Sequence, residues 1–572
     1  MNLETLRRRI MAARNKAPVD LVLRGGQVAD VFRGCLERVD VAMADGIIVG
    51  LGDYDGPGLD VSGKVVCPGL IDGHLHLEST MLSPPEFARA VVPRGTTSVI
   101  IDPHEIVNVL GVTGLEYILS FHDRLPLDLF VMLPSCVPAS PLETSGAQFG
   151  LEELSRYRSH PAVLGLAEVM NFPGVIAGDA EIMAKLSLFR HRVVDGHAPL
   201  LSGKDLNAYR VAGIGSDHEC TLLTEAQEKL ARGFYLMLRE GSAAKNLADL
   251  WPAVTPASLR RTLLVTDDCH PDDILHQGHM DRLIRRVQFL GGDPLAALTM
   301  ATLNPAEYFR LPHLGAVAPG YQADLVVLNN LEEFGVEKVF KRGRLVAAAG
   351  SLVDEVGAAA EATPPLAMQV KDLSLASFTI PAAGDTVKVM KLLPDQLLTA
   401  QVLVSTPAVD GLVQADLGRD ILKLAVVERH HGTGNVGLGL IQGFGLRRGA
   451  LASTVAHDSH NIIVVGTNDA DMLVAVKHLV DSGGGLAVAA GGEIVAALPL
   501  PIAGLMSPEP LAQVAGRYEA VTQASRALGA AMASPFMTLS FLALPVIPAL
   551  KLTDRGLVDV NRFTFVPLFG PD

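Results

Sequence analysis

The 572-residue sequence has few cysteines and no dense basic patch. Its five cysteines are odd in number and scattered, without a C-x-x-C pair. This argues against a disulfide framework or a cysteine-rich zinc site, and it fits a reducing compartment. Lysine and arginine number 47 against 62 for aspartate and glutamate, which gives a formal net charge of −15. Because no basic stretch is interleaved with aromatic residues, a nucleic-acid partner is not expected.

Segments that would insert into a membrane are also missing. The first residues, MNLETLRRRIMAARN, are charged and lack the apolar core of a signal peptide. The most apolar late stretch, residues 536–550, carries Pro545 and Pro548 and is too short to span a bilayer. We therefore expect a cytoplasmic protein with no membrane partner, and we attribute its mean hydropathy of +0.31 to large cores.

Two β-rich segments flank the first half of the chain. Residues 18–67 alternate apolar and polar residues between Gly-Gly and Asp-Gly turns, which predicts an antiparallel meander. A similar segment occupies residues 315–352, so we predict one small β-sandwich domain made of residues 1–67 and 311–357. A composition shift at residues 358–365 predicts a linker. Beyond it, residues 366–572 mix strand and helix patterns and are predicted to form an α+β C-terminal domain.

Between the two β segments, short apolar runs alternate with helical patterns, which is typical of βαβ units and a parallel sheet. Eight such runs over roughly 240 residues match the size of a (β/α)8 barrel. The runs begin at Val65, Thr97, Leu129, Val163, His191, Gly213, Phe234 and Leu263. We therefore predict an α/β, TIM-like barrel over residues 68–310, inserted in the small β-sandwich domain. In such barrels the active site lies at the carboxyl ends of the strands.

Polar residues at these strand ends predict a metal site. His74 and His76 stand two residues apart in an extended segment, so both imidazoles point to the same side. Imidazole is the commonest metal ligand, although such a pair alone also occurs without a metal. Four other strand ends carry Glu168, His197, His218 and Asp267. Four imidazoles and two carboxylates exceed what one ion needs, and a dinuclear centre bridged by one carboxylate would use them all.

Longer motifs surround these residues and continue to the end of the chain. They are PGLIDGHLHLES at 68–79, DPHEI at 102–106, MLPSCVPA at 132–139, LAEVM at 166–170, DGHAP at 195–199, SDHEC at 216–220, TDDCHPDD at 266–273, AHDSHN at 456–461 and PFMTLSFLALP at 535–545. Together they resemble the bacterial adenine deaminases of the amidohydrolase superfamily, over nearly the whole chain. Many superfamily members carry a carboxylated lysine on strand four, whereas this chain has Glu168, as adenine deaminases do.

The resemblance implies hydrolytic deamination of adenine to hypoxanthine and ammonia, by a metal-activated hydroxide that attacks C6. It also implies a small nucleobase substrate, and we expect a homo-oligomer, with a dimer as the expected state. The family suggests two manganese or iron ions per chain, and imidazole with carboxylate also accepts zinc. One ion would take His74, His76 and Asp267 and the other His197 and His218, with Glu168 bridging both.

A general acid or base is also required, because ammonia leaves only after protonation. Asp267 is one candidate for this proton transfer. Asp268, His104 and Glu105 lie beside it in the motifs and are further candidates. Alternatively, Pro103 only stops the second strand and His104 caps the helix that follows.

Other polar segments are weaker candidates. Residues 202–204 (Ser-Gly-Lys) lack the spacing of a phosphate-binding loop. Arg239 and Glu240, at the exit of the seventh strand, are expected to form a structural ion pair rather than a clamp for the substrate. After the eighth strand, three histidines are expected in surface loops or helices: His270, His276 and His279.

His457 and His460 have a spacing that would suit a third metal, but such a segment is more often a turn held by local hydrogen bonds. We expect the C-terminal domain to pack against the barrel or a neighbouring subunit rather than to hold the reactive metals.

Three functions stay open on the sequence alone. The first is a purine deaminase, and the second is another amidohydrolase that acts on a different nucleobase or a cyclic amide. The third is a non-catalytic scaffold derived from such a barrel. The scaffold is the weakest of the three, because every expected ligand type is present.

Overall fold

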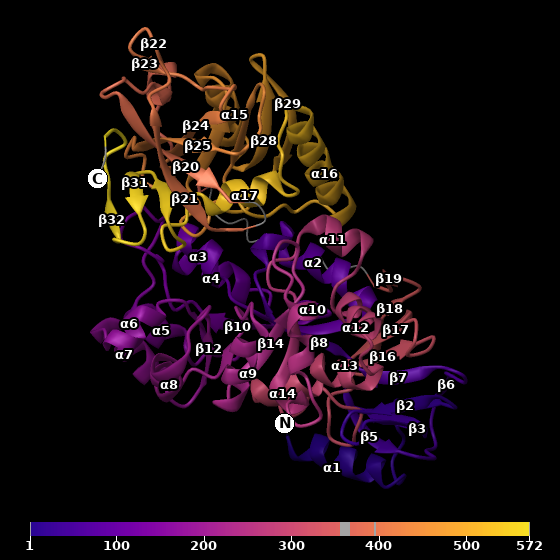
Figure 1. Cartoon of the computed structure of the whole chain (residues 1–572). Coiled ribbons are helices and arrows are strands. Elements are labelled where there is room, and N and C mark those ends of the chain that lie inside the picture. The colour runs from indigo at the N-terminus through magenta and orange to yellow at the C-terminus, as the bar shows by residue number, and fades with distance from the viewer. Residues whose placement is uncertain (1, 355–366, 394–395, 571–572) are drawn as a thin grey trace.

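The computed structural model describes residues 2–354, 367–393 and 396–570, so the predicted linker at residues 358–365 lies outside the described residues. A central barrel carries small β sheets on one flank and a C-terminal sheet at one end (Figure 1). Within the described residues, every helix is too short or too polar to cross a bilayer. All five cysteines are free thiols.

Eight parallel strands form the barrel in chain order, in a five-stranded and a three-stranded ladder. They are β8 (Leu70–Leu75), β9 (Thr96–Ile101), β10 (Asp128–Leu133), β11 (Val163–Val169), β12 (Val193–Gly196), β13 (Ser216–Asp217), β14 (Tyr235–Arg239) and β15 (Thr262–Val265). A parallel bridge between Leu75 and Asp267 joins the ladders on one side. On the other side the Gly215 N–H donates to the Val194 carbonyl at 2.8 Å. The predicted α/β, TIM-like arrangement is therefore confirmed.

The barrel strands are buried along nearly their whole length, as expected for a parallel sheet covered by helices. The helices after these strands are α2 (Pro84–Val91), α3 (His104–Leu110), α4 (Val112–Leu119), α5 (Leu151–Tyr157), α6 (Phe172–Ala177), α7 (Ala180–Phe189), α8 (Gly203–Val211), α9 (Leu223–Ala231), α10 (Leu247–Leu250), α11 (Pro271–His276), α12 (Met280–Phe289), α13 (Pro294–Met300) and α14 (Leu303–Tyr308). Local signals set several helix starts. The Asp179 carboxylate accepts hydrogen bonds from the first backbone N–H groups of α7, and Asp293 precedes Pro294 in α13.

The flanking β strands form two sheets rather than one meander. The seven-stranded sheet has the order β19 (Ser351–Leu352), β18 (Arg344–Ala348), β17 (Val336–Lys341), β16 (Leu325–Leu328), β7 (Val65–Pro68), β2 (Gln27–Asp30), β3 (Cys35–Arg38). The four-stranded sheet has the order β5 (Ile47–Leu51), β4 (Val41–Ala44), β1 (Leu21–Arg24), β6 (Gly58–Asp60), and α1 (Leu3–Ala13) packs on it. The antiparallel pairing of β7 with β16 joins the two sequence segments in one sheet.

The predicted antiparallel meander is wrong in part, because β1 pairs with β6 and β2 with β7 in parallel. The apolar run from Val65 was also predicted as one strand, and it is two. It breaks at Gly69, where an added Cβ would lie 2.1 Å from the Thr97 hydroxyl. Residues before this glycine join the seven-stranded sheet, and residues after it enter the barrel.

The C-terminal part is built on an eight-stranded sheet. Its order is β21 (Thr399–Ser405), β20 (Thr386–Leu392), β25 (Val436–Gln442), β24 (Ile421–Val427), β27 (Ile462–Gly466), β26 (Ala450–Ser453), β28 (Gly485–Ala490), β29 (Glu493–Pro499). Small strands complete it: β22 (Ala408–Val409) with β23 (Leu412–Val413), and β30 (Leu550–Thr553), β31 (Gly556–Asp559) and β32 (Thr564–Phe565). Its helices are α15 (Asp469–Asp481), α16 (Leu511–Ala527) and α17 (Pro535–Phe541).

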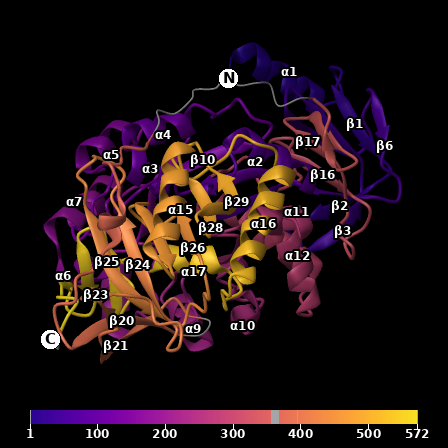
Figure 2. The same cartoon turned by 90° about the horizontal axis from the view of Figure 1, so that it is seen from above.

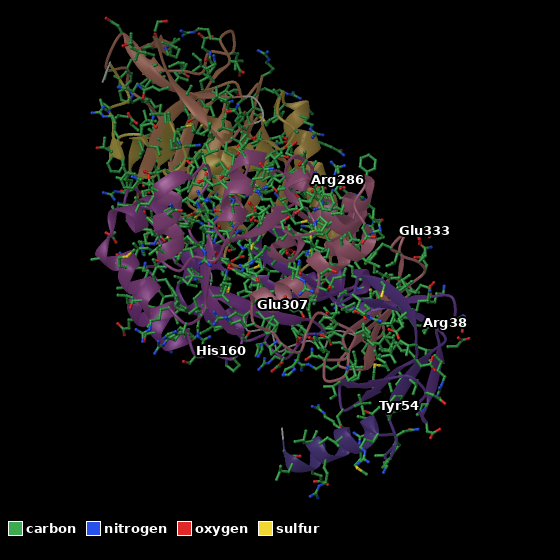
Figure 3. All side chains as sticks on the ribbon, turned by 60° about the horizontal axis from the view of Figure 1, so that its bottom comes forward. Arg38, Tyr54, His160, Arg286, Glu307 and Glu333 are labelled. Atoms are coloured by element: carbon green, nitrogen blue, oxygen red, sulfur yellow. The ribbon has the colours of Figure 1, made fainter. Side chains whose placement is uncertain are left out.

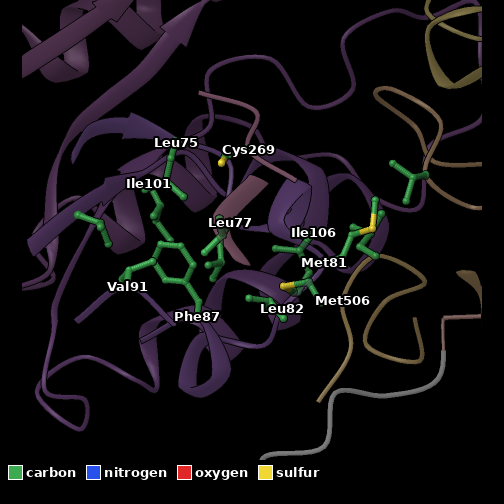
Figure 4. Packing of buried hydrophobic residues seen from close by; sticks show 14 of the residues in the cluster. Leu75, Leu77, Met81, Leu82, Phe87, Val91, Ile101, Ile106, Cys269 and Met506 are labelled. Atoms are coloured by element: carbon green, nitrogen blue, oxygen red, sulfur yellow. The ribbon is translucent and has the colours of Figure 1, made fainter. Parts of the chain in front are cut away.

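This C-terminal part packs on the barrel end where the strands finish. In Figure 2 its orange and yellow elements lie in front of the barrel, and Figure 3 turns toward the opposite end, where His160 and Glu307 lie. Helix α16 packs against α11 and α2. One continuous apolar core crosses the contact, and Figure 4 shows Met506 beside Met81 and Leu82. The Ser507 N–H donates to the Met81 carbonyl at 2.9 Å.

Candidate metal centre

The first two candidate ligands lie at the carboxyl end of strand β8. His74 is the fifth residue of the strand and His76 follows its end, and both side chains are buried. The His76 Nδ1 lies 3.1 Å from the Asp102 carbonyl oxygen. Since a carbonyl only accepts, Nδ1 carries the proton, and Nε2 faces the carboxylates of Asp267 and Glu168 as a potential ligand atom.

Asp267 follows strand β15 and faces both imidazoles. Its Oδ1 lies 3.4 Å from His74 Nε2 and 3.3 Å from His76 Nε2. The Asp267 backbone has a left-handed φ of 57°, a conformation that costs energy in a non-glycine residue and is common at functional sites. Its Oδ2 accepts a hydrogen bond from Arg239 at 2.9 Å. Burial raises the pKa of Asp267, but His74, His76 and Arg239 hold it well below its usual range.

Glu168, the sixth residue of β11, presents its two carboxylate oxygens to different imidazoles. Oε1 lies 3.7 Å from both His76 Nε2 and His104 Nδ1. Oε2 lies 2.8 Å from His197 Nδ1 and 3.0 Å from His218 Nε2. Burial opposes ionisation, yet His197 and His218 hold the pKa of Glu168 well below its usual range. Its carboxylate therefore stays charged between two sets of nitrogen ligands.

These distances fit a metal cluster. Two ligand atoms that each lie about 2.1 Å from one ion at a tetrahedral angle are about 3.4 Å apart. The nitrogen–oxygen separations of 3.3–3.7 Å around Asp267 Oδ1 and Glu168 Oε1 agree with that value, whereas those around Glu168 Oε2 are shorter, at 2.8 and 3.0 Å. His74 Nε2 is buried and has no hydrogen-bond partner among the described residues, as expected for a ligand atom. Of the six predicted ligands, only the His197 side chain is more than slightly exposed, at 27%.

Helix α3 brings His104 to the same cluster. His104 is the first residue of the helix, and it makes no side-chain capping bond, so the capping alternative is wrong. Its Nδ1 lies 3.2 Å from Asp102 Oδ2 and faces Glu168. Asp102, His104, His76 and Glu168 thus form a further group that could hold an ion.

Glu105, beside His104, lies in a separate buried pocket of carboxylates. The Ser79 hydroxyl donates to Asp268 at 2.5 Å and lies 3.3 Å from Glu105 Oε1, and so links the two side chains. Burial raises the pKa of Glu105 well above its usual range, and the neighbouring carboxylates of Glu78 and Asp268 raise it further. Burial and these neighbours therefore favour the neutral form of Glu105 near the ligand cluster.

The C-terminal part reaches this pocket through residues 456–461. His457 Nδ1 lies 3.8 Å from Glu105 Oε1, and His460 Nε2 lies 3.7 Å from Glu105 Oε2. Asp458 Oδ1 lies 4.0 Å from His104 Nε2. Glu105, His457 and His460 could hold an ion by distance. However, the Ala456 N–H donates to His460 Nδ1, so a neutral His460 carries its proton on Nε2 and cannot offer that atom as a ligand.

The structure corrects the expectation for the histidines after strand β15. His279 is fully buried, with Nε2 3.2 Å from Asp72 Oδ2 and Nδ1 3.0 Å from the Thr96 hydroxyl. His270 is also buried, against the Tyr518 hydroxyl. Only His276 lies at the surface as expected, with 60% of its side chain exposed. Each buried ring has one nitrogen in a hydrogen bond, and Asp72 faces the other nitrogen of His279, which helps both rings to leave the surface.

The expected ion pair between Arg239 and Glu240 is also wrong. Arg239 instead binds Asp267 and Glu219. Glu240 lies 3.6 Å from Arg286. Adjacent residues on a strand point to opposite faces, so a pair at consecutive positions does not meet.

Two acidic residues of the cluster were missed from the sequence. Glu219 Oε1 lies 3.6 Å from His218 Nε2 and 3.9 Å from His197 Nδ1. Asp102 faces His104 and holds His76 through its carbonyl. Both stand in the quoted motifs at the ends of barrel strands, which is the signal that would have identified them.

Comparisons with known proteins agree with this arrangement. Residues 65–346 match the family model described as Amidohydrolase family, and residues 396–564 match the Adenine deaminase C-terminal domain. The chain is 49% identical to an adenine deaminase of Desulfatibacillum aliphaticivorans, over 98% of this chain and 99% of that protein. It is 48% identical to adenine deaminase 2 of Carboxydothermus hydrogenoformans, over 98% of both chains. The chain therefore belongs to the adenine deaminase family, within the metal-dependent amidohydrolases.

Proposed function

We propose that this protein hydrolyses adenine to hypoxanthine and ammonia. The observation that carries the proposal is the position of Glu168, whose two oxygens face different sets of imidazoles at the mouth of the barrel. The names of the similar proteins supply the substrate, because they are adenine deaminases over their whole length.

We further propose two divalent ions per chain, manganese or iron, with zinc as the alternative. One ion would be held by His74, His76 and Asp267 and the other by His197 and His218, with Glu168 shared. When bound, two such ions lower the pKa of water and supply a nucleophile at neutral pH. The metal-dependence of the amidohydrolase family and the ligand distances support this assignment.

The protein's own residues would orient the base and move protons. Arg239 holds one oxygen of Asp267 and leaves the other directed at the imidazoles, so Asp267 is positioned to accept a proton there. The protonated Glu105 can donate to a ring nitrogen of adenine, with Asp268 linked to it through Ser79. His104 can hold a proton between Asp102 and Glu168. Proton transfer of this kind contributes roughly 10²–10⁴ in rate.

We also propose the domain boundaries predicted above, with residues 1–67 and 311–357 as a β-sandwich, 68–310 as the barrel and 366–572 as the C-terminal domain. The pairing of β7 with β16 and a core shared by the two small sheets support the first of these. A homodimer and a cytoplasmic location stay predictions.

The test is ammonia release from a panel of nucleobases and cyclic amides, with the purified, manganese-loaded protein and a chelator-treated control. We expect adenine to be the substrate and the chelated protein to be inactive. Activity on another nucleobase or a cyclic amide, without activity on adenine, would identify a different amidohydrolase. No turnover of any compound by the metal-loaded protein would favour a scaffold.

A further inference from the structure

A cavity lies at the end of the barrel away from the metal ligands. It has a volume of about 290 Å³ and is lined by residues at the amino ends of β12 to β15. Glu307, at its lining, is labelled in Figure 3 on the barrel face opposite the C-terminal part. Because the metal ligands follow the carboxyl ends of the strands, the two sites are separated by the length of the barrel.

Four arginines surround this cavity, and each is fixed by one hydrogen bond to a backbone carbonyl. The pairs are Arg192 with Val163 at 2.7 Å, Arg210 with Ile214 at 3.1 Å, Arg261 with Gly233 at 3.1 Å and Arg310 with His191 at 2.7 Å. A guanidinium has five N–H donors, so each side chain keeps donors for a ligand while its position is held. The carbonyls therefore orient the four guanidinium groups without neutralising them.

Within the described part of the chain, no carboxylate lies within ion-pair distance of any of the four guanidinium groups. Other arginines of this acidic protein do have such partners. Arg239 pairs with Glu219 and Asp267, and Arg342 pairs with Asp128. Glu307 is the single carboxylate among the lining residues. The cavity thus concentrates positive charge in a protein whose formal net charge is −15.

The remaining lining consists of two valines, two glycines and two tyrosines. The Arg261 guanidinium lies over the Tyr235 ring, 4.7 Å from its centroid, which fixes both groups. The Tyr308 hydroxyl donates to Asp195 at 2.7 Å, so it is turned into the barrel and its ring forms part of the wall. At Gly215 an added Cβ would lie 2.9 Å from the Tyr308 hydroxyl oxygen, so any larger residue would disturb this wall.

We propose that this cavity binds a small molecule through its phosphate groups. Guanidinium groups match phosphate oxygens bidentately, and the bonds between them are charge-assisted and strong. Four guanidinium groups against one carboxylate favour a ligand with two or more negative charges. The small volume suits pyrophosphate or the phosphate end of a nucleotide rather than a macromolecule.

The test is calorimetric titration of the metal-loaded protein with inorganic pyrophosphate at constant ionic strength. We expect the Arg210→Gln/Arg310→Gln double variant to weaken binding by at least about tenfold, because two charge-assisted contacts are lost. The matched control is Arg232→Gln, at the same end of the barrel but outside the cavity lining, and it should bind like the unaltered protein. Metal content is measured after each titration, because pyrophosphate also chelates metals.

A second variant covers the case in which the double variant does not fold. Glu307→Gln changes one exposed side chain and removes the only lining carboxylate, so we expect tighter binding. Two results would place the anion elsewhere, such as at the metals, and would overturn the proposal. One is normal pyrophosphate binding by the double variant, and the other is a pyrophosphate affinity that Glu307→Gln does not change. No binding by the unaltered protein would overturn it too. Tighter binding of a nucleoside 5′-diphosphate than of pyrophosphate would support a nucleotide as the ligand, and equal binding would support a free phosphate.

Discussion

Among single residues, Glu168 is the one whose substitution tests the metal site most directly, because strand β11 offers no other ligand at its carboxyl end. Each oxygen of its carboxylate faces its own set of imidazoles, and an amide nitrogen cannot replace either oxygen as an anionic ligand. We expect Glu168→Gln to stay folded, to lose at least one metal per chain, and to lower the deamination rate by several orders of magnitude. Metal analysis, circular dichroism and ammonia release measure these three quantities.

A control for this change is Glu116→Gln, far from the cluster, where the carboxylate pairs with the exposed Arg156. The control should keep its metals and its rate. A folded Glu168→Gln protein with two metals and near-normal deamination would show that Glu168 has only a structural role at the barrel rim.

The buried charge of Lys551 should make the free energy of unfolding depend on pH. Its ammonium is buried and has no carboxylate partner among the described residues, and it donates to the carbonyls of Leu397 at 3.0 Å and Phe541 at 2.9 Å. Burial lowers the pKa of Lys551 to about 7. The unfolded chain, with a lysine pKa near about 10.4, therefore binds this proton more tightly than the folded protein.

The pH dependence follows from that difference. Below about pH 7 Lys551 is protonated in both the folded and the unfolded protein, so the full cost of burying its charge lowers the free energy of unfolding. This cost disappears as the pH rises toward about 10, because the folded protein then holds Lys551 uncharged. In this window the free energy of unfolding should rise by about 1.4 kcal/mol per pH unit relative to Lys551→Met. Urea unfolding of both proteins from pH 7 to 9.5 measures this difference. A difference independent of pH would mean that Lys551 is charged in the folded protein throughout.

At the scale of elements, the segment before β27 connects the C-terminal sheet to the barrel mouth. The His457 ring stacks on Phe541 of α17, and Asn461 donates to the Thr144 carbonyl at 2.8 Å. The His460 tautomer excludes its Nε2 as a ligand, so the reactive metals should not depend on this segment. We expect His457→Gln/His460→Gln to retain both barrel metals, as measured by metal analysis of the folded protein. Loss of both metals without unfolding would mean that the metal site lies here.

The ends of the barrel strands were predictable because polar residues interrupt apolar runs there. His74, Glu168 and Asp267 stand at such interruptions, and alternation along a strand then decides which way each side chain points. The partners of His279 were not predictable, because Asp72 lies about two hundred residues away and burial depends on packing. The parallel pairs β1–β6 and β2–β7 were missed for a similar reason, since local turn signals describe only adjacent strands.

At the scale of the whole molecule, the C-terminal part covers the metal cluster. His457 and Asp458 lie within about 4 Å of Glu105 and His104, so residues of two parts of the chain enclose the ligand cluster. A free nucleobase needs less room there than a nucleoside. We expect adenine to be deaminated faster than adenosine by roughly 10²-fold or more in kcat/KM. Comparable turnover of adenosine, measured in the same ammonia assay, would contradict this expectation.

The small β sheets are attached to the barrel by a buried charge cluster at Lys341, the last residue of β17. Its ammonium lies 2.6 Å from both Asp128 and Asp324 and donates to the Thr97 carbonyl at 2.9 Å. Asp128 and Thr97 belong to the start of barrel strands, whereas Asp324 precedes β16 of the seven-stranded sheet. One side chain therefore links both parts of the chain.

Removing this ammonium would leave two buried carboxylates near each other without their main cation, although Arg342 still contacts Asp128 at 3.0 Å. Breaking a buried ion pair from one side costs roughly 3–5 kcal/mol. We expect Lys341→Met to lower the free energy of unfolding by about 3 kcal/mol in urea, with Arg342 offsetting part of the loss. The control is Arg344→Gln on the next strand, where the side chain is 82% exposed and lies 4.0 Å from Asp354, and no measurable change is expected. Equal stability of the two variants would show that apolar packing alone attaches the sheets to the barrel.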